Sequence, residues 1–312
     1  MTDAPQNGTA EIPSNKLKAS WQLLQLTFSE WWNDNTFELS AALAFYATFS
    51  IAPVLLITVG IASFFLTSDT AENQIISEFQ GMIGPQGAQA IRQVIESSRG
   101  FGKGIFAVGV GIITLIIGAT AVFGELQAAL NRIWDVKSKP DSVVIVRLII
   151  ERVRSFSIAL AVGFLLLVSL VISAVISGLQ HYMSNWLPGI PWFWQTANVV
   201  ASFVVVAVLF AMIYRFLPDV RLAWSDVRIG AVVTALLFTG GKYVIGIYLG
   251  QTALGSAFGA AGSLAVLLFW IYYSALIGFF GAEFAQVYAR RYGSGIHPQR
   301  HAERIGKKSD RI

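Results

Sequence analysis

The sequence predicts an all-α membrane protein with six transmembrane helices, an amphipathic N-terminal interfacial helix and a small helical cap on the extracytoplasmic side. Three observations carry this prediction. Six apolar stretches are long enough to cross a bilayer, since a helix needs about 20 apolar residues to span a hydrocarbon core of roughly 30 Å. The composition is 55% hydrophobic and only 13% charged, with a mean hydropathy of +0.61. Basic residues also alternate strongly in number between successive loops.

The six predicted spans are continuously apolar rather than alternating, which argues against the strands of a membrane barrel. They cover about residues 39–66, 104–124, 155–180, 191–214, 229–249 and 258–282. Charge interrupts only the fifth of them, at Lys242. The chain is therefore divided into an N-terminal tail (1–15), a six-span membrane domain (16–292) and a basic cytoplasmic tail (293–312). We expect both tails to be disordered.

Lysine and arginine assign the two sides of the membrane. Of the 22 such residues, 18 lie before the first span, in the second and fourth loops, or after the last span, and only 3 lie in the first loop. The positive-inside rule then places both termini in the cytoplasm. The same asymmetry accounts for the basic isoelectric point, so we expect anionic lipid headgroups as partners and no nucleic acid.

Three segments outside the spans have their own periodicity. Leu17, Trp21, Leu24, Phe28 and Trp31 recur at helical spacing, which is typical of a helix lying in the inner interface. In the first outer loop, the apolar residues predict two short helices that form the cap: Ile75, Ile76, Phe79, Met82, Ile83, Ile91, Val94 and Ile95. Residues 125–136 are expected to extend the second span by about three turns into the cytoplasm.

Lys242 is the sharpest candidate functional residue. It lies about seven residues, or about 10 Å, below the outer end of its span. A lysine at this depth either snorkels to the headgroups or faces a cavity, where an anionic substrate group or lipid phosphate would be its counter-ion. The carboxylates Glu38, Glu125 and Glu283 are predicted at the opposite ends of their spans.

Two backbone features also have alternative interpretations. Pro53 lies mid-span and removes one helical hydrogen bond, so it is either a packing kink or a hinge beside a cavity. Glycines spaced by four residues at 246–250 and 255–259 indicate close helix packing, with a permeation path as the alternative.

The inner ends of the spans collect charged residues. Asp34, Glu38, Glu125 and Glu283 are predicted at this level together with Arg154, Arg215 and Arg228. Ion pairs that tie helix ends together are one interpretation. Proton coupling or substrate gating by Glu125 or Glu283 is the other, because burial raises the pKa of a carboxylate.

No catalytic pattern is present in the sequence. The chain has no cysteine and only three histidines, His181, His297 and His301, and it lacks nucleotide-binding and metalloprotease motifs. We therefore expect a protein that is not an enzyme and that uses no cofactor and no metal.

Four blocks of sequence resemble the successive signatures of the YihY/BrkB family, named after a virulence-associated membrane protein. They are DNTFELSAALAFYATFSIAPVLL, ALNRIWDV, YRFLPDVRLAWSDVRIGAVV and GSAFGAAGSLAVLLFWIYYSALIGFFGAEFAQV. The resemblance runs from about residue 21 to 288. The positions that match the polar signature are Asp34, Asn35, Tyr46, Pro53, Asn131, Trp134, Pro218, Asp219, Lys242 and Glu283. It implies a bacterial inner-membrane protein with six spans.

The resemblance implies little about chemistry, because the family has no agreed activity. Its members have been connected with serum resistance and with export of lipid or lipopolysaccharide precursors. An older ribonuclease BN label finds no metal-ligand cluster in this chain to support it.

Two classes of function follow. One is a transporter or flippase for an amphiphilic, anionic molecule such as a lipid or envelope precursor. The other is a non-transporting envelope-integrity or scaffold protein, and either is compatible with a homo-oligomer. The candidate functional residues are Lys242, Glu283, Glu125, Asp34, Asn131 and Asp219, with Pro53 as the candidate hinge.

Overall fold

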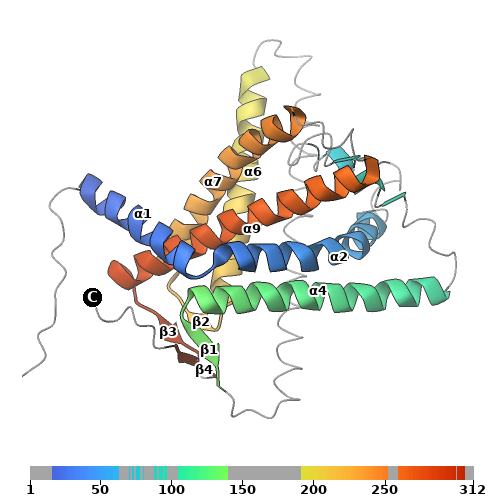
Figure 1. Ribbon diagram of the computed structural model, residues 1–312. Helices are drawn as coiled ribbons and strands as arrows, with labels where there is room; N and C mark the ends of the chain where they lie inside the picture. The colour runs from blue at the N-terminus through green and yellow to red at the C-terminus, as the bar shows by residue number, and fades with distance from the viewer. Residues whose placement is uncertain are drawn as a thin grey trace, which may run out of the picture.

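The computed structural model describes residues 16–62, 105–139, 191–251, 259–299 and 301–305, with scattered helical residues between 70 and 96. The long helices are α1 (Lys16–Asn33), α2 (Thr36–Ala62), α4 (Ile105–Ile133), α6 (Pro191–Phe216), α7 (Trp224–Gln251) and α9 (Gly259–Arg291). Four short strands accompany them: β1 (Val136–Ser138), β2 (Val220–Arg221), β3 (His297–Pro298) and β4 (Ala302–Arg304). The protein is therefore mainly helical, as predicted (Figure 1).

Five of the six predicted spans coincide with long helices, α2, α4, α6, α7 and α9. The helix α4 continues to Ile133, which confirms the predicted extension beyond its apolar stretch. By length and hydropathy, two segments of the described helices are able to cross a membrane, Val199–Phe216 and Leu264–Arg291. The predicted span at 155–180 and the N-terminal tail lie outside the described residues.

Small residues set how closely the helices approach one another. The helix α9 packs against α2 on one side and α7 on the other, and α2 also packs against α4 (Figure 1). A Cβ added at Gly118 of α4 would lie 2.7 Å from Oγ of Ser50 in α2. A Cβ at Gly230 of α7 would lie 2.5 Å from Cβ of Ala285 in α9. Close helix packing is therefore present at Gly118 and Gly230, whereas the packing of the predicted motif at 246–250 and 255–259 lies outside what the structure describes.

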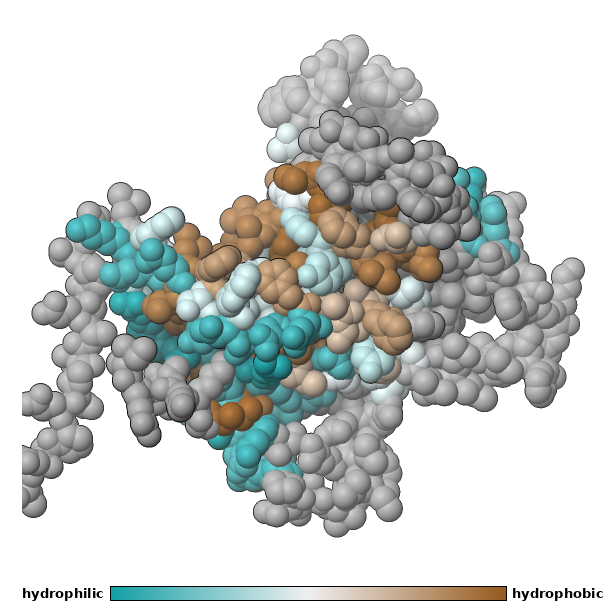
Figure 2. Space-filling view, in the orientation of Figure 1, coloured by the Kyte–Doolittle hydropathy of each residue, from teal (hydrophilic) through white to brown (hydrophobic). Residues whose placement is uncertain are grey.

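The helices have two distinct ends. At the strand end, where α4, α6 and α9 finish, an apolar core gathers around the fully buried Trp134 and Leu217. At the cap end, Ile75, Ile91 and Ile95 of the first loop pack with Ile245 of α7 and with residues of α9. Figure 2 shows hydrophilic residues concentrated toward the strand end and hydrophobic residues over the helices.

The predicted interfacial helix is α1, and most of its predicted apolar face is exposed. Trp21 is 62% exposed and Phe28 is 54% exposed. Trp31 instead anchors the helix, because its indole Nε1 donates to the carbonyl of Leu276 in α9 at 3.3 Å. The chain then bends into α2 at Asn35, whose φ of 54° lies in the left-handed region that asparagine tolerates.

The tail beyond α9 differs from the prediction of disorder. Residues 297–304 contain β3, which pairs antiparallel with β2, and β4, which pairs antiparallel with β1. The backbone amide of Lys139 also donates to the carbonyl of His301 at 2.9 Å. The order comes from strand partners far away in the sequence, which a local pattern of basic and polar residues does not reveal. We call residues 292–299 and 301–305 the C-terminal strap.

Candidate functional site

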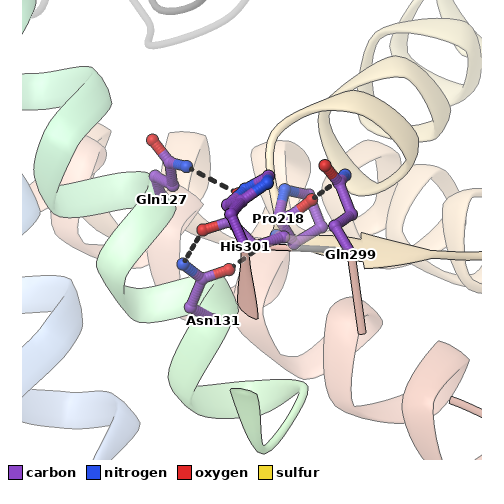
Figure 3. A network of polar contacts seen from close by, with 6 residues as sticks. Gln127, Asn131, Pro218, Gln299 and His301 are labelled. Atoms are coloured by element: carbon purple, nitrogen blue, oxygen red, sulfur yellow. Dashed lines mark hydrogen bonds and ion pairs between the residues drawn. The ribbon is translucent and has the colours of Figure 1, made fainter. Parts of the chain in front are cut away.

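A polar network at the strand end includes Gln127, Asn131 and His301 (Figure 3), and the residue that all three contact is the buried Asp219. Its carboxylate accepts hydrogen bonds from Nε2 of Gln127 at 3.2 Å and from Nδ2 of Asn131 at 2.9 Å. Nε2 of His301 in the strap lies 3.1 Å from the same carboxylate. The backbone of Asp219 is held as well, because its amide donates to Oδ1 of Asn131 and its carbonyl accepts from the amide of Gln299. One aspartate therefore joins α4, the end of α6 and the strap.

The local sequence explains how Asp219 reaches this position. Leu217 and Val220 on either side of it are buried in the apolar core. Gln127 and Asn131 are four residues apart in α4, so they lie on one face of that helix. The carboxylate is only 2% exposed, and burial of a charge is tolerated when hydrogen bonds compensate it.

A second group of polar contacts centres on Asp135 and connects the end of α4 with α1, α9 and the strap. Oδ2 of Asp135 accepts from Nε2 of Gln286 at 3.1 Å and lies 3.8 Å from Nη1 of Arg290, both in α9. The same Arg290 nitrogen lies 3.7 Å from Oε1 of Glu30 in α1. The carbonyl of Asp135 accepts from the amide of Ile305 in the strap at 2.8 Å. The end of α4, α1, α9 and the strap therefore meet at Asp135.

A third aspartate fixes the start of the strap. Oδ2 of Asp226, in the first turn of α7, accepts from the amide of Ser294 at 3.1 Å and from its hydroxyl at 2.9 Å. A side chain at Gly293 would not fit, because its Cβ would lie 2.6 Å from the Asp226 carboxylate. Asp135, Asp219 and Asp226 together hold the strap against the ends of three helices, α4, α6 and α7.

The predicted site residues differ in their burial and in their contacts. It brings Asn131 and Asp219 into direct contact, although they are 88 residues apart. It buries Asp34 at the α1–α2 junction and buries Glu283 completely in α9. Glu125 and Lys242 are half-buried, in α4 and α7 respectively. Pro53 lies inside α2, which continues through it as one helix.

Among the described residues, the other charged residues predicted at this level lie outside the Asp219 network. Glu38 is exposed, and Arg154 lies outside the described residues. Arg215 and Arg228 both contact Trp224. The ion pairs that tie helix ends together are those of Glu30 and Asp135 with Arg290. Glu30, Asp135 and Arg290 are not among the residues for which the sequence predicted such pairs.

Sequence reasoning missed the strap residues and the residues that bind them. Gln127, His301 and Gln299 complete the Asp219 network, while Asp135 and Gln286 form the second group. One signal in the sequence pointed to Asp135. Aspartate is one of the residues that tolerate the left-handed conformation just beyond a helix end, and the φ of Asp135 is 54°. The glutamines of these networks, Gln127 on α4 and Gln286 on α9, carried none.

The chemistry available at this site is hydrogen bonding and ion pairing. Among the described residues, no group of three or more carboxylate, histidine or cysteine side chains is arranged to hold a metal ion. The three aspartates meet amides, hydroxyls, a histidine and an arginine from other segments. This arrangement suits a site that holds segments together.

Long apolar helices with their polar contacts gathered at one end define the class, a helical membrane protein. The chain belongs to the virulence factor BrkB family, whose family model matches residues 27–306.

Curated relatives agree with this assignment. A UPF0761 membrane protein of Pseudoalteromonas translucida is 26% identical, with 77% of each chain covered. A second, from Alteromonas mediterranea, is 24% identical, covering 80% of this chain and 82% of the relative. A third, from Rhodospirillum centenum, is 27% identical over 81% of this chain and 54% of a longer relative. No solved structure matches the chain.

Proposed function

We propose that the protein moves an amphiphilic, anionic molecule, such as a lipid or envelope precursor, across the bacterial inner membrane. The strap and the Asp219 network form its closed inner gate. The observation that carries the proposal is the network itself, in which a carboxylate that is 2% exposed binds side chains from two other segments of the chain.

The polar character of this contact supports a gate. Apolar surfaces resist separation because water does not compensate their exposure. Hydrogen-bonded groups exchange protein partners for water when they part, so a typical hydrogen bond stabilises the closed state by only about 1 kcal/mol net. A contact built from several such bonds is specific when closed, and it opens at moderate cost. His301 covers the network from outside, with its side chain 54% exposed.

A non-transporting envelope scaffold is the second candidate. The exposed aromatic residues of α1 favour it, since Trp21, Phe28 and Trp32 are each more than half exposed and suit contact with a membrane surface or a partner. The two functions predict different outcomes in a system that contains only lipid and this protein.

Lipid exchange in proteoliposomes tests the proposal. We expect fluorescent phosphatidylglycerol to exchange between leaflets faster in vesicles that contain the protein than in protein-free vesicles, read as the fraction accessible to dithionite over time. The substitution His301→Ala should accelerate exchange several-fold, because it removes one partner of Asp219. Gln22→Ala, which removes an exposed hydrogen bond to Arg291, serves as the control.

A result of no exchange above the protein-free rate, for both folded wild type and folded His301→Ala, would reject this function. Exchange that is equally fast in wild type and His301→Ala would keep the transport function and reject the gate.

The proposed function includes a topology of six spans with both termini in the cytoplasm. The chain has no cysteine, so single cysteines at Ser68 and Ser309 report the two sides. We expect an impermeant thiol reagent to label the variant at 68 in intact spheroplasts and the variant at 309 only after permeabilisation. Labelling of 309 but not 68 in intact spheroplasts would invert the orientation.

A further inference from the structure

Two arginines meet at one exposed tryptophan where α6 ends and α7 begins. The guanidinium carbon of Arg215 lies 5.7 Å from the ring centroid of Trp224. Nε of Arg228 donates to the carbonyl of Trp224 at 3.2 Å. The ring of Phe216 packs edge-on against Trp224, with the ring centroids 6.0 Å apart. Both arginines therefore contact Trp224, Arg215 at its ring and Arg228 at its backbone carbonyl.

Both arginines retain donors for a ligand. Within the ranges that the structure describes, neither Arg215 nor Arg228 forms an ion pair with a carboxylate. A guanidinium group carries five N–H donors, and contact with an aromatic face or one carbonyl leaves several of them available. Guanidinium groups bind phosphate well, since charge-assisted hydrogen bonds are the strong ones.

The apolar surroundings indicate which phosphate. Val200, Val204 and Val208 are exposed and repeat every four residues along α6, and Arg215 follows on the same face. On α7 the same spacing relates Arg228 to the exposed Val232 and Leu236. Two apolar stripes therefore run from the two arginines along helices that pack against each other.

The position in the bilayer agrees with a lipid. Arg215 and Phe216 are the last two residues of the apolar segment Val199–Phe216. Tryptophan and arginine are favoured at this level, where an aromatic ring meets the headgroups and a cation meets their phosphates. Trp224 and Phe216 are each nearly half exposed there.

We propose that Arg215, Arg228 and Trp224 form a binding site for one anionic phospholipid of the leaflet at the strand end. The headgroup phosphate binds the two guanidinium groups, and the acyl chains lie along the valine stripe of α6 and the Val232–Leu236 stripe of α7. This site does not depend on whether the chain transports a substrate.

Native mass spectrometry of the detergent-solubilised full chain tests the site, with phosphatidylglycerol or phosphatidylcholine as the added lipid. We expect wild type to retain phosphatidylglycerol in preference to phosphatidylcholine. The double variant Arg215→Gln/Arg228→Gln should bind phosphatidylglycerol about tenfold more weakly, as loss of a charge-assisted contact implies. The control Arg132→Gln/Arg221→Gln removes the same charge from exposed positions on α4 and β2 and should bind like wild type.

Three outcomes would overturn the proposal. They are unchanged binding by the Arg215→Gln/Arg228→Gln variant, equal losses in both double variants, and displacement of the lipid by inorganic phosphate at comparable concentration. The last of these would identify a free anion as the ligand. If the glutamine variant fails to fold, phosphatidylglycerol binding by the double variant Arg215→Lys/Arg228→Lys tests the site instead. This variant keeps both charges but lacks the planar donors, so several-fold weaker binding supports the site and unchanged binding rejects it.

Discussion

Replacing Gly281 by alanine is expected to destabilise the protein by about 1–3 kcal/mol, the usual cost of overpacking a tight contact. A Cβ at this position in α9 would overlap Oγ1 of Thr234 in α7 and lie 2.9 Å from the hydroxyl of Tyr214 in α6. Thr234 has no room to yield, because its Oγ1 lies 2.8 Å from the Tyr214 hydroxyl and donates to the carbonyl of Gly230 at 2.8 Å. The added methyl group would therefore push α7 and α9 apart.

Thermal unfolding in detergent measures this effect, and the chain supplies matched controls. Gly124 and Gly240 are also helical glycines, but a Cβ at either would meet nothing within 4 Å. Alanine at these two positions should be neutral or slightly stabilising, since it is the better helix former. Thr234→Ala should partly rescue Gly281→Ala in a double-mutant cycle, because it removes the overlapping oxygen. A Gly281→Ala protein as stable as the controls would show that this contact is loose.

Asp219→Ala is expected to destabilise the strand end by about 2–4 kcal/mol. The substitution removes the acceptor shared by Gln127, Asn131 and His301, and it leaves the two buried or half-buried amides without that partner. The strap should also become accessible to trypsin, because Asp219 joins it to α4. The measurements are the unfolding midpoint and the rate at which trypsin releases a C-terminal epitope.

An exposed carboxylate in the strap, Glu303, is the control for this prediction. Glu303 pairs with Lys137 at 3.1 Å, with side chains 42% and 59% exposed. Exposed pairs of this kind contribute about 0–1 kcal/mol, so Glu303→Ala should barely change the midpoint. Equal effects of the two substitutions would mean that the Asp219 network does not hold the strap.

The helices were largely predictable from the sequence, because long uncharged stretches have few alternatives to helix in a bilayer. The predicted extension of α4 is an example, since the sequence predicted it for residues 125–136 and the helix continues to Ile133. Their boundaries were less certain. The helix α9 continues to Arg291, well beyond the predicted end of the last span at residue 282, because its last turns pack on the strand-end core through Ala285 and Ala289.

The candidate site was predictable only in part. Asn131 and Asp219 could be named one by one, but their contact depends on how the ends of α4 and α6 are placed relative to each other. His301 is 82 residues from Asp219 and lies in a segment without apolar periodicity, so no local pattern indicates its partner. Lys242 shows the opposite case. Its charge within an apolar stretch is conspicuous in the sequence, the structure places it half-buried on α7, and its role stays a prediction.

The strap has a consequence for the order in which the protein matures. Its strands β3 and β4 follow α9 in the chain, whereas their partners β2 and β1 precede α7 and α6 respectively. The described helices are therefore synthesised before the strap, and until the strap emerges Asp219 and Asp135 lack their contacts with His301 and Ile305. A premature stop codon just after α9 would yield a chain that inserts normally but exposes hydrated carboxylates at its strand end. Quality-control proteases would meet such a chain as a late intermediate.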